Sequence, residues 1–72
     1  MNIPVVIEHD SAGFYAHAPT LPGCQTQGPT MAEALKRIEE AIVLYVETLS
    51  PAERHALRHQ HVLTTMIEVQ VA

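Results

Sequence analysis

Seventy-two residues, 47 % of them hydrophobic, are enough for one small globular domain and leave no room for a second core. A formal charge of −4, from four Lys and Arg against eight Asp and Glu, argues against direct nucleic-acid binding, which depends on clustered basic side chains. A single cysteine excludes an internal disulfide, and the N-terminus shows neither a signal peptide nor a membrane anchor, so we expect a cytoplasmic protein with no membrane partner.

Three short strands are predicted in the first part of the chain. Residues 3–8 are rich in β-branched side chains and are followed by turn-forming residues and then by residues 14–18, a pattern that predicts an antiparallel hairpin. Residues 24–28 alternate small and polar side chains and are predicted to add a third strand to the same sheet.

A tight turn is predicted between the second and third strands. Pro22 fixes its φ angle, and Gly23 can adopt the positive φ that the third position of a type II turn requires. We expect Leu21 to enter the core beside this turn. Cys24 has no histidine close to it in the sequence, so we interpret it as a small buried apolar residue and not as a catalytic nucleophile.

The strongest pattern in the sequence is a long amphipathic helix. Thr30 and Glu33 have the spacing of a capping box, and apolar residues then recur every three or four positions over residues 31–49. Three further apolar residues lie off this stripe: Val43, Leu44 and Val46. Their position predicts burial against the rest of the chain or against a second subunit.

Two more elements are predicted at the C-terminal end. Ser50, Pro51 and Glu53 have the pattern of a helix N-terminus, which predicts a short second helix ending near His59. Residues 62–71 have high β-propensity and predict a final strand. A sheet covered by helices on one face keeps its other face and its edges exposed, so we expect oligomerisation.

Three histidines are the weak candidates for a metal site. His55, His59 and His61 have the spacing H-x3-H-x-H, and the first two share one face of the predicted helix. No glutamate accompanies them as in the H-E-x-x-H motif, and Arg58 lies among them. We interpret them as solvated residues.

Acidic residues offer an alternative function. A two-metal nuclease needs several carboxylates that converge on the ions, and Glu8 or Asp10 together with helix carboxylates would have to supply them. We prefer the structural interpretation, in which ordinary capping and solvation explain these residues. A stand-alone oligomeric scaffold is a further alternative.

One joined motif links the turn to the helix. It consists of Tyr15, Ala16, Pro19, Leu21, Pro22, Gly23, Cys24, Thr26, Gly28, Thr30, Glu33 and Ala34, followed by Ile38, Glu40, Ala41 and Ile42. This motif resembles the signature of the HicB-like antitoxin family, and the resemblance covers residues 3–48 well. In that family these positions correspond to scaffold residues and not to catalysts.

The resemblance implies a partial ribonuclease-H-like β-β-β-α-β fold that forms dimers or tetramers. It also implies binding of a small basic HicA-type toxin, an mRNA interferase that resembles a double-stranded-RNA-binding domain. An acidic chain suits such a partner. We therefore expect a short antitoxin-like protein, a single domain over residues 1–72 with no cofactor, no catalytic residue and no DNA-binding domain.

Overall fold

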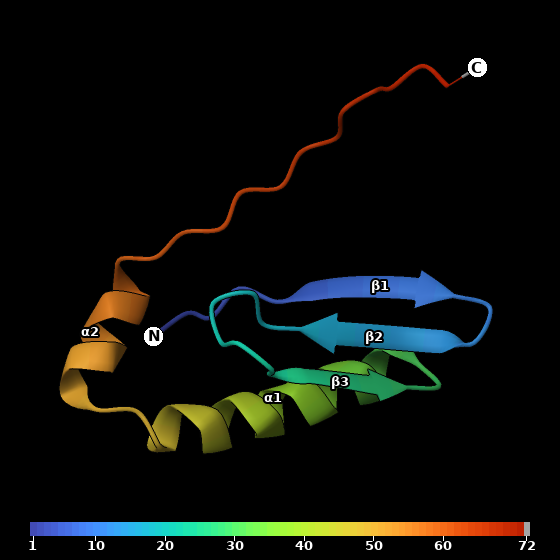
Figure 1. The fold of residues 1–72 in the computed structure, drawn as a ribbon. Helices are drawn as coiled ribbons and strands as arrows, with labels where there is room; N and C mark the ends of the chain where they lie inside the picture. Colours follow the sequence, from blue (N-terminus) through green and yellow to red (C-terminus); the bar gives the residue numbers. More distant parts are fainter. Residues whose placement is uncertain (72) are drawn as a thin grey trace.

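A three-stranded antiparallel sheet lies on one long helix, and a short second helix packs at the end of this layer (Figure 1). The computed structural model describes residues 1–71. Its elements in chain order are β1 (Val6–Asp10), β2 (Gly13–His17), β3 (Gln25–Gly28), α1 (Met31–Glu47) and α2 (Pro51–Arg58). The strands lie in the order β1-β2-β3, so the predicted α+β class, meander and two helices are confirmed.

The first hairpin is tighter than the sequence suggests. Asp10 pairs with Gly13, which leaves only residues 11–12 in the loop, and the Asp10 carboxylate accepts a hydrogen bond of 2.8 Å from the Ala12 amide. The predicted strand began at residue 3, whereas β1 begins at Val6. Pro4 precedes this start and has no amide hydrogen to contribute to a strand ladder.

The turn between β2 and β3 has the predicted geometry. The Cys24 amide donates a 3.0 Å hydrogen bond to the Leu21 carbonyl, and Gly23 has a φ of 81°. The Ala18 amide also donates to the Cys24 carbonyl at 3.0 Å, which closes the loop at its base. The turn directs Leu21 into the core, where 1 % of its surface stays exposed, as predicted.

Helix α1 begins at the predicted cap, with one difference. The Thr30 hydroxyl accepts a 3.2 Å hydrogen bond from the Glu33 amide, as in a capping box. The Glu33 carboxylate instead contacts the Arg37 guanidinium at 3.2 Å and, within residues 1–71, makes no hydrogen bond to the Thr30 amide. Only one of the two hydrogen bonds of a capping box is therefore present. Arg37 also donates to the Gln27 carbonyl at 2.6 Å and thereby ties α1 to β3.

Helix α2 begins with a complete capping box. The Ser50 hydroxyl accepts from the Glu53 amide, the Glu53 carboxylate accepts from the Ser50 amide, and Pro51 occupies the first turn, all as predicted. Arg54 donates through Nε to the Val46 carbonyl at 3.3 Å and joins α2 to the end of α1. Neither helix in the described part of the chain has the length and apolarity needed to cross a membrane.

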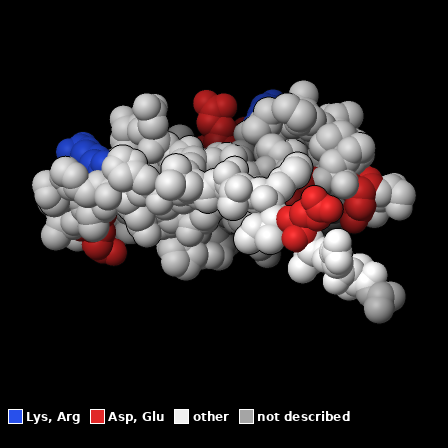
Figure 2. Space-filling view, turned by 90° about the horizontal axis from the view of Figure 1, so that it is seen from above, with Lys and Arg blue, Asp and Glu red and all other residues white. Residues whose placement is uncertain are grey.

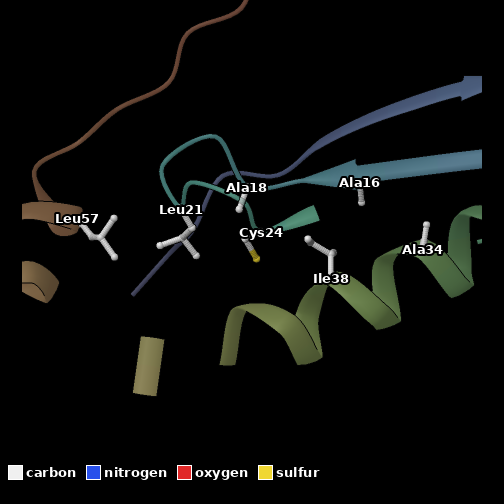
Figure 3. Packing of buried hydrophobic residues seen from close by; sticks show 7 residues of the cluster. All are labelled: Ala16, Ala18, Leu21, Cys24, Ala34, Ile38 and Leu57. Atoms are coloured by element: carbon white, nitrogen blue, oxygen red, sulfur yellow. The ribbon is translucent and has the colours of Figure 1, made fainter. Parts of the chain in front are cut away.

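The core lies between the sheet and α1, and it continues toward α2. Its buried apolar residues are Ala16, Ala18, Leu21, Cys24, Ala34, Ile38 and Leu57. Figure 3 shows Ala34 and Ile38 directed from α1 toward the sheet, while Leu57 of α2 points toward Leu21 of the turn. Gly28 lets β3 approach the helix start, because an added Cβ would lie 3.0 Å from the Ala34 amide nitrogen.

The predicted final strand is wrong for the isolated chain. Residues 62–71, here called the C-terminal arm, follow α2 as an extended segment without strand pairing and project away from the sheet (Figure 1). A sequence with high β-propensity becomes a strand only when a neighbouring strand satisfies its amides and carbonyls. The arm has no such neighbour within residues 1–71.

Candidate functional site

The joined motif runs through β2, the turn, β3 and the first part of α1. Leu21, Cys24 and Gly28 are buried, while Pro22 and Gly23 are exposed at the turn. Burial of Cys24 confirms its predicted place in the core, and it raises the pKa of the thiol, which therefore stays protonated near neutral pH. Four more motif residues lie in a strand, in a loop and at a helix cap: Tyr15, Pro19, Thr30 and Glu33.

The open face of the sheet, opposite α1, is polar and shallow. A hollow of about 310 Å³ on this face is lined mainly by Glu8, Tyr15, His17, Gln25 and Gln27. Its side chains are mostly neutral amides and rings, with one carboxylate among them. This surface offers hydrogen-bond partners and carries a single carboxylate.

The acidic residues named for a nuclease site do not converge. Glu8 lies in the hollow on the open face of the sheet, whereas α1 covers the opposite face. The Asp10 carboxylate is bound to the amide of the hairpin loop. Across residues 1–71, no three His, Cys, Asp or Glu side chains come together in a group that could hold a metal ion.

The histidines are only partly brought together. The ring of His55 on α2 and the ring of His59, which directly follows α2, are exposed and lie with centroids 4.6 Å apart. His61 follows the helix and joins no such group in the described residues. The pair by itself supplies two of the four ligands that a structural zinc site takes.

The outer face of α1 carries exposed apolar residues next to acidic ones. Val43 and Leu44 keep 53 % and 65 % of their surface exposed, so the chain does not bury them itself. They line an open groove of about 590 Å³ together with Lys36, Glu39 and Glu40. Glu47 follows one turn later, because residues three and four apart are neighbours on a helix. We call Glu39, Glu40, Val43, Leu44 and Glu47 the α1 strip.

The carboxylates of the α1 strip are free to meet a partner. Glu33 and Arg37 form the one ion pair found in residues 1–71, which leaves Glu39, Glu40 and Glu47 without one. On the face drawn in Figure 2, the acidic side chains form separate groups and no continuous patch. Negative charge alone therefore does not mark a binding site for a partner on that face. The α1 strip differs because negative charge and exposed apolar surface coincide there.

A known family matches almost the whole chain. The model of the HicB-like antitoxin of bacterial toxin-antitoxin systems matches residues 3–70. The chain belongs to this family. It is also 40 % identical to a UPF0150 protein of Helicobacter pylori over 72 residues, which is the full length of both. A UPF0150 protein of Archaeoglobus fulgidus is 43 % identical over 54 residues, which cover 74 % of this chain and 78 % of the relative.

A third relative of the HicB-like chain comes from Thermoplasma acidophilum. This UPF0150 protein is 50 % identical over 50 residues, which cover 68 % of this chain and 72 % of the relative. No solved structure matches the chain. Membership of the HicB-like family supports an antitoxin role, which is not an enzymatic one, and implies a toxin as partner.

Proposed function

We propose that this HicB-like protein binds and neutralises a small basic mRNA-interferase toxin of the HicA type. It would act in the cytoplasm as one domain over residues 1–72, through contact alone, without a cofactor. The observation that carries the proposal is the α1 strip, where three carboxylates that form no ion pair within residues 1–71 surround two exposed apolar side chains on one helix face. Family membership supplies the class of partner.

Charge favours this pairing. A protein that binds RNA presents Lys and Arg to the phosphates, and the same side chains attract an acidic protein surface. The chain as a whole carries −4, and the α1 strip carries three of the eight acidic residues. Electrostatic attraction raises the association rate and sets the orientation of the partner. An antitoxin bound in this way covers the surface that the toxin needs for RNA.

The apolar part of the α1 strip supplies affinity. Charge pairs at the edge of an interface contribute little, whereas burial of an apolar side chain contributes about 1.5–3 kcal/mol. Val43 and Leu44 lie side by side between Glu40 and Glu47 on α1. This arrangement, an apolar centre with charged residues around it, is typical of a protein interface.

The open sheet face is a weaker candidate for the same role. Its hollow contains a single carboxylate, Glu8, and its other side chains are mainly neutral and polar. Glu8 therefore supplies a matched control, because it is an exposed acidic residue on the face opposite α1.

Co-expression with a small basic HicA-type toxin, which we expect to be encoded beside this chain, tests the proposal. Wild-type protein should relieve the growth arrest that the toxin causes and should co-purify with it. The double variant Glu40→Lys/Glu47→Lys should lose both effects, because it places positive charge against a basic partner. Glu8→Lys, which changes the charge on the other face, should keep both effects.

Two outcomes of this experiment would contradict the proposal. Continued growth arrest and separate elution with the wild-type protein would refute toxin binding. Loss of binding in Glu8→Lys, with full binding in the double variant, would place the partner on the sheet face and refute the α1 strip. Circular dichroism of each variant should show an unchanged fold, since all three substituted residues are exposed.

A further inference from the structure

Two histidine rings lie next to each other at the C-terminal end of α2. His55 is in the helix and His59 is its C-cap, so the two side chains are one helical turn apart on the same face. Their ring centroids are 4.6 Å apart, with 59° between the ring planes. Both residues are exposed, whereas Leu57, on the opposite side of the helix, is buried in the core. The pair is therefore open to a ligand from solution.

The separation of the two rings matches what a single metal ion requires. An imidazole nitrogen binds a first-row transition metal at about 2.0–2.1 Å, which places the ring centroid about 3.2 Å from the ion. Two rings bound at right angles around the ion then have centroids about 4.5 Å apart, and two bound at the tetrahedral angle have centroids about 5.2 Å apart. The 4.6 Å between His55 and His59 corresponds to the right angle.

The helix end favours a cation at this position. The last carbonyls of a helix carry a partial negative charge, which stabilises positive charge near the C-terminus. The last turn of α2 is also well formed, because the His59 amide donates to the Ala56 carbonyl and the Gln60 amide donates to the Leu57 carbonyl, each at 3.2 Å. These bonds hold the backbone that positions the two rings.

Two arginines are the cationic side chains closest to the pair in the sequence. Arg54 donates through Nε to the Val46 carbonyl, which holds its side chain against the end of α1. Arg58 is exposed and is a neighbour of His55 on the helix surface. Its charge opposes a bound cation, but the effect between exposed groups is small and is screened by salt.

We propose that His55 and His59 together bind one divalent transition-metal ion that accepts ligands at right angles, such as Ni²⁺ or Cu²⁺. Imidazole is a preferred ligand of these ions, and a tetragonal arrangement is typical of them. Water completes the coordination, because within residues 1–71 no group of three His, Cys, Asp or Glu side chains could hold an ion. This inference does not depend on the proposed antitoxin function.

The bound ion fastens the last turn of α2. A helix of eight residues is marginal by itself, and α2 contacts the rest of the chain through the buried Leu57 and the bond from Arg54 to Val46. An ion shared by His55 and His59 joins the two ends of one helical turn. Because it binds the folded turn better than the unfolded chain, it stabilises α2 in its contact with the core.

Calorimetric titration of the full-length protein, without a purification tag, with NiCl₂ is the first test. The wild type should bind one ion with a Kd in the micromolar range. His55→Gln and His59→Gln should each weaken binding at least about tenfold, since even a residue that only supports a metal ligand contributes about 10–100-fold. His17→Gln removes a histidine from the open face of the sheet and should bind Ni²⁺ like the wild type. Mg²⁺, which prefers oxygen ligands, should not bind the pair.

Thermal unfolding gives a readout of the effect on α2. Addition of NiCl₂ should raise the Tm of the wild type and of His17→Gln, and it should leave the Tm of His55→Gln/His59→Gln unchanged. Circular dichroism in the absence of metal should show the same helix content in all these proteins, because the substituted residues of α2 are exposed.

Three results would overturn the proposal. The first is half-saturation of the wild type only above about 1 mM Ni²⁺, which would show that the two rings are held together by aromatic packing alone. The second is a loss of affinity in His17→Gln as large as that in His55→Gln, which would place the ion elsewhere. The third is an equal rise of the Tm in the double variant and in the wild type.

Discussion

Leu21 lies at the centre of the core, and Leu21→Ala is expected to remove about half of the protein's stability. The side chain is 1 % exposed and belongs to the buried cluster that contains Ala18, Cys24 and Leu57. Truncation of a buried leucine to alanine costs about 2–5 kcal/mol. Backbone bonds from Leu21 to Ala18 and from Cys24 to Leu21 hold the turn open, so the cavity cannot collapse and a cost of about 3–5 kcal/mol is expected.

This cost is large for so short a chain. At about 0.05–0.15 kcal/mol per residue, the free energy of unfolding is about 4–11 kcal/mol for 72 residues. Urea unfolding followed by circular dichroism, at one protein concentration, measures the change. The control Leu44→Ala removes a leucine that is 65 % exposed, and it should change the free energy of unfolding by less than about 0.5 kcal/mol. The account of the core is refuted if Leu21→Ala changes it as little as the control.

Three more variants test separate contacts. Thr20 buries a hydroxyl that has no hydrogen-bond partner within residues 1–71. Thr20→Val should therefore raise the free energy of unfolding in urea by about 1 kcal/mol. A decrease of that size would show that the hydroxyl is hydrogen-bonded. Gly28→Ala places a Cβ 3.0 Å from the Ala34 amide nitrogen and should lower stability by about 1–3 kcal/mol; an unchanged thermal midpoint would show that the helix start moves freely. Hydrogen bonds from the Ser50 backbone and side chain lower the pKa of Glu53, so the stabilisation is present at neutral pH and is lost as pH falls through that lowered pKa. Ser50→Ala keeps the backbone hydrogen bond, which is the larger cause, and removes the side-chain one, so it should move this pKa only part of the way back toward its ordinary value in an NMR titration. An unshifted curve would contradict the contribution of the Ser50 hydroxyl.

Features that depend on neighbouring residues were predictable from the sequence. The turn at Pro22 and Gly23 follows from the φ angles that these two residues adopt, and the start of α2 follows from Ser50, Pro51 and Glu53. Burial of Cys24 and Leu21 follows from the turn between them. Each of these contacts joins residues only a few positions apart.

Features that depend on distant contacts were not predictable in the same way. The sequence around Arg37 gives no sign of its contact with β3, because its partner, the Gln27 carbonyl, lies ten residues earlier in the chain. The same arginine draws Glu33 away from the capping box. Val43 and Leu44 were recognised as surplus apolar residues, but the structure was needed to show that the chain leaves them exposed beside Glu39 and Glu40.

The C-terminal arm shows most clearly what β-propensity alone does not predict. Its β-propensity predicted a strand over residues 62–71, and propensity reports only how well side chains suit a pleated surface. Whether a strand forms depends on an edge that can pair with it. Within residues 1–71 the arm has no such edge beside it, so its β-propensity alone did not decide the outcome.

RNA cleavage by the purified toxin, measured as this protein is added, tests the central proposal most directly. Cleavage should fall as wild-type protein is added and should cease once enough is present to occupy every toxin molecule. Glu8→Lys should act like the wild type, while Glu40→Lys/Glu47→Lys should need at least about tenfold more protein, the effect of about 1.4 kcal/mol of lost binding. Undiminished cleavage in an excess of wild-type protein would contradict the antitoxin function.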